Sequence, residues 1–307
     1  MATERELKQR INTVKNTSKI TSALAAISAS KANRAQARVG ATRDYADKAF
    51  EILNNLASGS ATVTHPMLVG RDEIKNVAVI AFTGDRGLAG SYNSDIVRLV
   101  EGLIEKLGDT VESVKIVAVG KKGRDLFIRR GYDVIASFIN MPDPPSPNDI
   151  TPVAQVVVDD YLDGKVDQVF VAYTDFINMV SRYARTKQLL PLAPTDFTGS
   201  PLAELFEAPA SPAETGGRSS NADYAYEPPA DELLDAIVPR FVDLQLYQSY
   251  LESLASEHSA RYVAMNNATD NAKALIEDLT LARNKARQTA ITAEILDIVG
   301  GAAALED

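Results

Sequence analysis

The chain has 307 residues, a net charge of −9 at pH 7 and an isoelectric point near 4.9. A nucleic-acid-binding protein usually carries a positive field, so this balance argues against nucleic acid as a partner. The absence of cysteine excludes disulfides and thiolate metal sites, and the two histidines, His65 and His258, lie far apart with no ligand-like pattern. We therefore expect neither a metal nor a cofactor. No apolar run approaches the roughly 18 residues needed to cross a bilayer, and no signal peptide is recognisable, so we expect a soluble bacterial chain.

Residues 4–56 are predicted to form one long helix. Apolar or small residues recur at alternating steps of three and four, which is the coiled-coil spacing, and no proline interrupts them. The centre of this stripe is rich in Ala, Ser and Thr, which permits close helix approach but contributes little apolar burial. The stripe comprises Leu7, Ile11, Val14, Thr17, Thr21, Leu24, Ser28, Ala32, Ala35, Val39, Thr42, Ala46, Ala49, Leu53 and Leu56.

The first helix is also strongly basic. Between residues 8 and 43 it carries eight basic side chains and no acidic one, whereas the rest of the chain is acidic. A charge run is usually a solvated face, but this segregation of sign favours an acidic partner surface. The basic residues are Lys8, Arg10, Lys15, Lys19, Lys31, Arg34, Arg38 and Arg43.

Residues 70–195 are predicted to form an α/β, Rossmann-like domain. Short apolar runs at 76–82, 114–119, 133–139 and 166–174 alternate with helical patterns at 94–107, 121–130 and 152–162. Strands that are apolar on both faces are typical of a mainly parallel sheet covered by helices on both sides. The alternating run 179–190 is predicted to be an edge strand.

A glycine-rich loop follows the first predicted strand and reads TGDRGLAGSYN, residues 83–93. Three glycines between strand and helix suggest phosphate binding, but the spacing of Gly84, Gly87 and Gly90 fits neither dinucleotide-binding nor P-loop patterns. A tight loop that positions the next helix is the favoured interpretation, with Asp85 and Arg86 left as possible binding contacts.

The second half of the chain predicts a proline-rich turn at 140–151, a loop or linker at 196–230, and a second long helix within 231–307. Pro239 predicts a kink or a late start, and Gly300-Gly301 predicts the helix end. Such a helix would be roughly 100 Å long and needs a partner of similar length. We expect it to form an antiparallel coiled coil with the helix of residues 1–57. Its stripe comprises Ile237, Phe241, Leu244, Tyr247, Leu251, Leu254, Tyr262, Met265, Ala268, Ala272, Leu275, Leu279, Ala282 and Ala286.

Antiparallel pairing of Leu53 with Ile237 would bring Leu7 close to Arg283, since both helices rise equally per residue. Basic residues of the two helices, including Arg10 and Arg283, would then meet and repel, which favours an acidic third party outside. Residues 288–305 would project beyond the first helix. Because this overhang is apolar, it predicts a socket in a partner.

Several segments carry a specific resemblance. Residues 256–305 read SEHSARYVAMNNATDNAKALIEDLTLARNKARQTAITAEILDIVGGAAAL and resemble the signature of the gamma subunit family of F-type ATP synthases. The segment LKQRINTVKNTSKITSAL, the glycine-rich loop and PRFVDLQLYQSYLES are similar to the same family. The resemblance implies a non-catalytic central rotor shaft. Its partners would be the alpha and beta subunits of the head, the epsilon subunit and the membrane ring of c subunits.

The resemblance also implies roles for individual residues. Arg287 and Gln288 match positions that contact a catch loop of a beta subunit, and Arg283 lies beside them. Arg10, Lys19 and Lys31 would meet the acidic lever region of beta subunits. The apolar tip, with Ile298, Val299 and Leu305, would sit in the bearing of the head. The chain departs from the family at Leu24-Ala25-Ala26, where many members have Met-Glu-Met, and at Ala89, where a cysteine is usual.

Three functions differ in how well the sequence meets their needs. A mechanical subunit, peripheral on the cytoplasmic side of the plasma membrane, needs rigidity, asymmetry and complementary charge, and the sequence supplies all three. A nucleotide-dependent enzyme needs a phosphate cradle and a catalytic set, and the sequence displays neither. A free coiled-coil scaffold would leave the apolar overhang unexplained.

Overall fold

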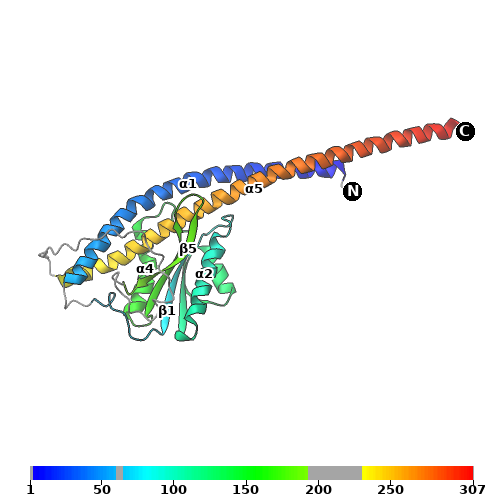
Figure 1. Cartoon of the computed structure of the whole chain (residues 1–307). Coiled ribbons are helices and arrows are strands. Elements are labelled where there is room, and N and C mark those ends of the chain that lie inside the picture. Colours follow the sequence, from blue (N-terminus) through cyan, green and yellow to red (C-terminus); the bar gives the residue numbers. More distant parts are fainter. Residues whose placement is uncertain (1–2, 60–64, 193–229, 307) are drawn as a thin grey trace.

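The computed structural model describes residues 3–59, 65–192 and 230–306. Two long helices, α1 (Glu4–Gly59) and α5 (Ala230–Glu306), run side by side, and an α/β domain lies against them at one end (Figure 1). At 1.5 Å per residue, α5 is about 115 Å long. The predicted fold class, a mainly parallel α/β domain flanked by a coiled coil of the two terminal helices, is confirmed.

The two helices are antiparallel in the predicted register. The hydroxyl oxygens of Thr21 and Thr269 lie 2.6 Å apart in the buried seam. Further along, Ala35 and Val39 of α1 share a buried cluster with Leu251 and Ala255 of α5. Both sets of contacts fit the pairing of Leu7 with Arg283 that the stripe predicts.

The sheet has five strands in the order β3-β2-β1-β4-β5. The first four pair in parallel and β5 pairs antiparallel with β4, so the predicted edge strand is confirmed. The strands are β1 (Asn76–Phe82), β2 (Ser113–Val119), β3 (Asp133–Phe138), β4 (Gln168–Phe176) and β5 (Arg182–Leu190). The helices between them are α2 (Tyr92–Leu107), α3 (Lys121–Arg129) and α4 (Pro147–Leu162), with a short 3-10 helix η1 (Gly108–Thr110) after α2.

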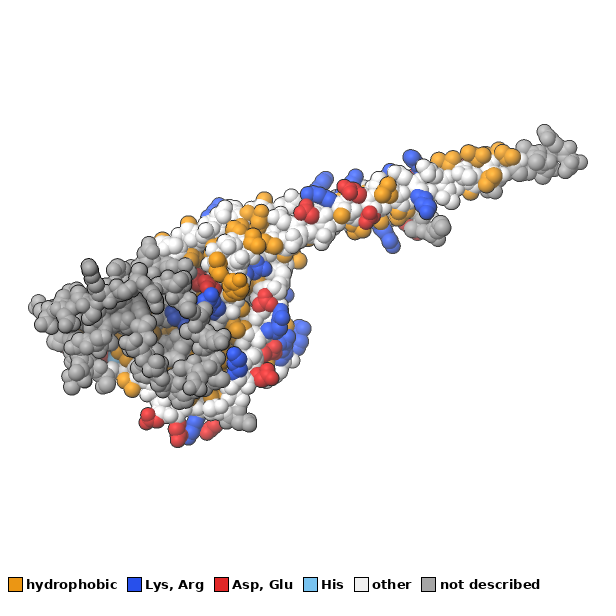
Figure 2. All heavy atoms as spheres, viewed as in Figure 1, with side chains coloured by type: hydrophobic (Ala, Val, Ile, Leu, Met, Phe, Trp, Pro, Cys, Tyr) orange, Lys and Arg blue, Asp and Glu red, His pale blue; other side chains and the backbone are white. Residues whose placement is uncertain are grey.

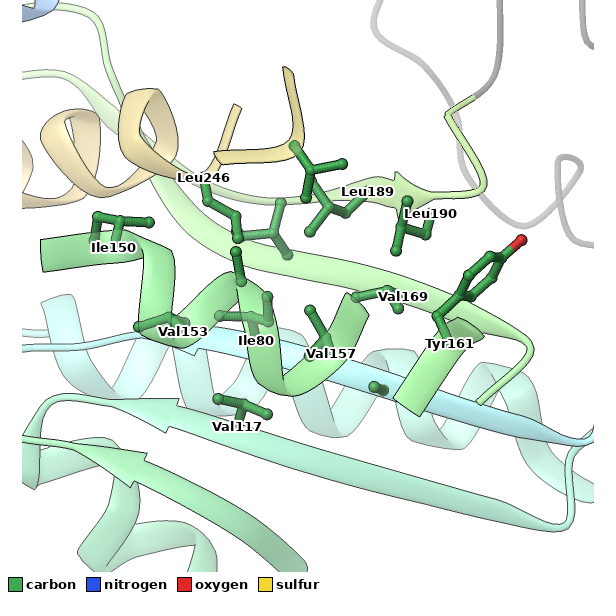
Figure 3. Close-up of a cluster of buried hydrophobic side chains, with 14 of the residues drawn as sticks. Ile80, Val117, Ile150, Val153, Val157, Tyr161, Val169, Leu189, Leu190 and Leu246 are labelled. Atoms are coloured by element: carbon green, nitrogen blue, oxygen red, sulfur yellow. The ribbon is translucent and has the colours of Figure 1, made fainter. Parts of the chain in front are cut away.

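Successive side chains of a strand point to opposite faces, so the buried strands contribute to two separate cores. On one face Val77, Val79 and Ala81 pack against α2 and α3. On the other, Ile80 and its neighbours pack against α4 and the first part of α5 (Figure 3). The side chains labelled in Figure 3 are Ile80, Val117, Ile150, Val153, Val157, Tyr161, Val169, Leu189, Leu190 and Leu246.

The first part of α5 is buried on more than the predicted stripe. Leu246 and Tyr250 belong to the core against the sheet, whereas Leu251 and Ala255 lie in the cluster shared with α1. The predicted stripe accounts for contact with a partner helix only. The helix instead lies between α1 and the sheet, so a second apolar face is needed.

Two predicted helix boundaries are wrong. Helix α5 continues past Gly300-Gly301 to Glu306, because a glycine costs only about 1 kcal/mol relative to alanine and the residues that follow are good helix formers. At its other end α5 begins at Ala230, one residue before the predicted range 231–307, so Pro239 lies inside the helix and the alternative of a late start does not hold. Helix α4 begins at Pro147 rather than 152, because the Asp149 carboxylate accepts the Ser146 N–H at 2.7 Å as half of a capping box. The predicted linker 196–230 falls, up to residue 229, outside the described residues.

Candidate functional site

The basic residues of α1 lie at different places along the coiled coil. Lys19 is exposed, and Arg10 is exposed beside a groove that it shares with Val14, Leu275 and Leu279. Lys31 differs from both, since its ammonium lies 2.7 Å from the carboxylate of Asp143 in the α/β domain. The structure therefore places Arg10 and Lys19 on an open surface, and it gives Lys31 a partner within the chain.

The second candidate group lies where α1 begins. Arg287 and Gln288 are exposed on α5, whereas Arg283 is half-buried and its Nη2 reaches the side-chain oxygen of Asn284 at 3.5 Å. Arg283 and Arg287 are one turn apart and so share a face of the helix. Together with Arg10, they give this end of the coiled coil a positive surface.

Beyond this group α5 continues alone. Ile295, Leu296, Ile298 and Val299 are 53–65% exposed. Figure 1 shows the C-terminal end projecting past the N-terminus, and Figure 2 shows apolar side chains gathered along it. The side chain of Leu305 lies outside the described part of the chain. Isolated apolar residues are normal on a surface, but a continuous run on an unpartnered helix indicates an interaction site.

The glycine-rich loop uses its polar groups internally. The N–H of Gly84 donates to the Asn93 side-chain oxygen at 2.8 Å, and the Gly123 N–H donates to the Thr83 hydroxyl at 3.0 Å. The Asp85 carboxylate accepts the N–H groups of Lys121 and Asn140 at 2.8 and 2.9 Å. A phosphate cradle needs such donors to face a ligand. The geometry therefore supports a loop that positions the next helix, and both carboxylate oxygens of Asp85 are used in hydrogen bonds within the chain.

This loop also seats α5. A Cβ at Gly84 would lie 2.7 Å from the Glu257 carboxylate, so a larger residue here would force the Glu257 side chain to shift. Arg261 pairs with Glu257 at 2.5 Å and points two nitrogens at the Gly87 carbonyl, each at 3.4 Å. Burial raises the pKa of Glu257, and the neighbouring Arg261 opposes that rise.

A polar cluster fills the junction of α1, α5 and the domain, beside a cavity of about 530 Å³. His258 is 5% exposed, and its Nε2 lies 3.3 Å from the Asp143 carboxylate that also holds Lys31. Burial lowers the pKa of His258 to about 4 although Asp143 opposes this, so the ring is neutral at pH 7. Burial disfavours the charged form of Asp143, but Lys31 and His258 outweigh it and its pKa lies below the usual value.

Sequence reasoning missed this cluster. The only advance signal was that His258 is one of two histidines, and nothing in the sequence linked it to Asp143 or Lys31. Within residues 3–59, 65–192 and 230–306, no three His, Asp or Glu side chains lie together as metal ligands would. Nor does any helix in those ranges have the length and apolarity to span a bilayer.

Comparisons with known proteins agree with this architecture. A family model described as ATP synthase matches residues 3–305. The ATP synthase gamma chain of Roseiflexus castenholzii is 42% identical over 308 residues, covering all of both chains, and that of Dehalococcoides mccartyi is 42% identical over 99% of this chain and all of the relative.

Two solved structures share the fold. A chain of the Euglena gracilis mitochondrial ATP synthase, in a structure of its OSCP, F1 and c-ring, aligns with a TM-score of 0.59 at 17% identity over 98% of this chain and 94% of that one. A chain from the central stalk and c-ring of the Tetrahymena thermophila enzyme gives 0.57 at 24% identity, over 81% and 99%. With relatives above 40% identity over the full length, the chain belongs to the ATP synthase gamma chain family.

Proposed function

We propose that the chain is the central rotor shaft of an F-type ATP synthase, coupling rotation of a ring of c subunits to ATP synthesis or hydrolysis in the beta subunits of the head. The observation that carries this proposal is the two-helix arm whose longer helix ends in an exposed apolar tip. The subunit itself catalyses no reaction. It supplies an asymmetric, stiff and charged surface. The same proposal makes the alpha, beta and epsilon subunits and the c-ring its partners, peripheral on the cytoplasmic side of the bacterial membrane.

The charge along the arm supports specific contacts with the beta subunits. Arg10, Lys19, Arg283 and Arg287, with Gln288, form the surface proposed to meet acidic and polar groups of beta subunits. An exposed arginine pairs well with carboxylates because its planar fork can donate two parallel hydrogen bonds. Ile298, Val299 and Leu305 would enter an apolar bearing in the head, which would bury the surface that the isolated chain leaves exposed.

Reconstitution tests the proposal. The chain is combined with alpha and beta subunits of a close relative, and a probe is attached through Glu105→Cys, an exposed position on α2 in a chain without other cysteines. Stepwise rotation of the probe during ATP hydrolysis is expected. A chain that fails to enter the complex, or that enters but does not turn, would contradict the shaft role.

The double variant Arg287→Ala with Gln288→Ala is expected to lower ATP synthesis at least threefold while the complex still assembles. Both side chains are exposed, so the fold does not depend on them, whereas the proposed beta-subunit contact does. Synthesis is measured in energised membrane vesicles. The matched control is Asn271→Ala with Lys273→Ala, which removes an exposed amide and an exposed cation elsewhere on α5. Equal synthesis in the two double variants would refute the assignment.

Deleting residues 298–307 is expected to leave the melting temperature of the isolated chain nearly unchanged and to lower coupled synthesis by the assembled enzyme. The described side chains of this segment are exposed, so the isolated fold loses no burial. Calorimetry of the isolated chain and synthesis in vesicles measure the two effects. A large fall in melting temperature would show that the tip serves the chain's own stability.

A further inference from the structure

The proline-rich turn between β3 and α4 contacts both helices of the arm at two points. At the first, Asp143 receives the Lys31 ammonium of α1 at 2.7 Å and lies 3.3 Å from Nε2 of His258 of α5. At the second, the Pro145 carbonyl accepts Arg38 Nη1 of α1 at 3.5 Å and the Tyr247 hydroxyl of α5 at 3.3 Å. Each point therefore joins one cation of α1 to one side chain of α5. We call residues 143–145 the bracket.

Spacing along the helices matches this arrangement. Lys31 and Arg38 are seven residues apart, so they lie on one face of α1 two turns from each other. Between them on α1, Ala35 packs in the buried cluster with Leu251 and with Phe176 of β4. The bracket thus closes over a stretch where α1, α5 and the sheet are already in contact.

The bracket is also held firmly in the domain. On its β3 side the Asn140 N–H donates to Asp85 at 2.9 Å, and on its α4 side Ser146 is capped by Asp149. Pro144 and Pro145 fix backbone φ angles within it, and Pro142 does so immediately before it. A loop anchored at both ends and stiffened in the middle can carry load without extending.

Force can pass from the domain to the arm by two routes. Helix α5 lies on the sheet, with Leu246 and Tyr250 in the core, so it moves with the domain directly. Among the side chains of α1 that the structure describes, residues 4–42, none belongs to that core, and the contacts of α1 with the domain include Ala35, Val39 and the bracket. The alanine-rich seam between the helices buries little apolar surface and so resists sliding of α1 along α5 only weakly. The polar contacts of Lys31 and Arg38 with the bracket are therefore more important for holding α1.

We propose that the bracket fixes α1 to α5 and to the α/β domain, with Asp143 as the positioning residue through which rotation of the domain reaches α1. This inference rests on the shaft role proposed above. It assigns Lys31 to a contact inside the chain, whereas its sequence-based assignment was to an acidic surface of a beta subunit. Arg38 gains a role in the same bracket.

The first test compares Asp143→Ala, Lys31→Ala and their combination in the assembled enzyme, by ATP-driven proton pumping per ATP hydrolysed in inverted vesicles. Each single variant is expected to lower the ratio at least twofold, and the double variant no further, because both changes break one contact. Lys31→Arg, and the exchange of Lys31→Asp with Asp143→Lys, are expected to recover the ratio. Asp133→Asn, an exposed carboxylate on β3, is the control and should pump as wild type.

Three outcomes separate the possibilities. Unchanged pumping in the single variants would overturn the bracket. Loss in Lys31→Ala that the charge exchange does not recover would return Lys31 to a partner surface and also overturn it. If the unmodified chain does not support pumping at all, the shaft role itself fails.

The second test measures geometry in the full chain alone. Spin labels at Asn33→Cys on α1 and Glu105→Cys on α2, both exposed, report the distance between arm and domain. Asp143→Ala is expected to broaden the distance distribution and Asp133→Asn to leave it narrow. An equally narrow distribution in both variants would show that α1 is held without the bracket.

Discussion

Replacing Gly120 with alanine is expected to destabilise the α/β domain by more than about 4 kcal/mol, enough to prevent folding of a marginally stable domain. Gly120 has a φ of +103°, and a Cβ there would lie 2.1 Å from the Thr83 carbonyl oxygen. The obstacle is backbone at the end of β1, which a rotamer change cannot relieve. Thermal unfolding of the purified full chain, followed by circular dichroism, measures the effect.

Two other glycines serve as matched controls. Gly131 also has a positive φ, +84°, but a Cβ there meets nothing within 4 Å, so Gly131→Ala should cost only about 1–2 kcal/mol of conformational strain. Gly40 lies in α1 with open space around it, and Gly40→Ala should stabilise the helix by about 0.5–1 kcal/mol. Equal losses at Gly120 and Gly131 would mean that the backbone relaxes away from the clash.

Acidification from pH 7 to pH 4 is expected to remove about 3 kcal/mol of stability through His258 alone. The pKa of this ring is 6.5 in an unfolded chain and about 4 in the folded one, so the unfolded state binds the proton more readily between these values. Stability is therefore fully present above pH 6.5 and is lost progressively as the pH falls to about 4. Burial is the main cause, with Asp143 opposing it and Arg261 and Lys31 adding to it.

The variant His258→Gln tests this effect, because glutamine keeps a polar group but does not titrate. Urea unfolding of the full chain at pH 7, 5.5 and 4 should show a smaller loss of stability in the variant than in the wild type. His65→Gln is the control. Burial lowers the pKa of His65 too, so this variant should also lose less stability between pH 7 and pH 4 than the wild type, but the difference should be smaller than for His258→Gln. A pH dependence that His258→Gln leaves intact would contradict a neutral buried ring.

Local pattern was enough for most of the fold. The apolar run at residues 76–82 coincides with β1, because a strand buried on both faces must be apolar throughout. The helix register is the one expected if Leu53 pairs with Ile237, since Thr21 meets Thr269 in that pairing. The exposed basic residues and the exposed apolar tip were also predictable, because each is a local feature of one helix or the other.

What sequence could not give depends on contacts between distant segments. The local sequence around Asp143 does not indicate its contacts with Lys31 and His258, which form only in the folded chain. Likewise, Gly84 looks like a phosphate-loop glycine until Glu257 of α5 is placed against it. The error at Gly300-Gly301 has another source: the helix-breaking preference of a glycine, about 1 kcal/mol relative to alanine, is overridden within a long helix.

The arm changes from two helices to one near the start of α1, and this step sets how it responds to load. A pair of helices packed side by side resists bending and twisting far more than either alone, so the section below the step behaves as a stiff rod and the tip as a compliant extension. Arg283 and Arg287 lie at the step itself, at the upper limit of the stiff section. In the proposed shaft, torque applied at the domain would pass through the paired section as far as these arginines, whereas the single-helix end would only have to keep the axis centred.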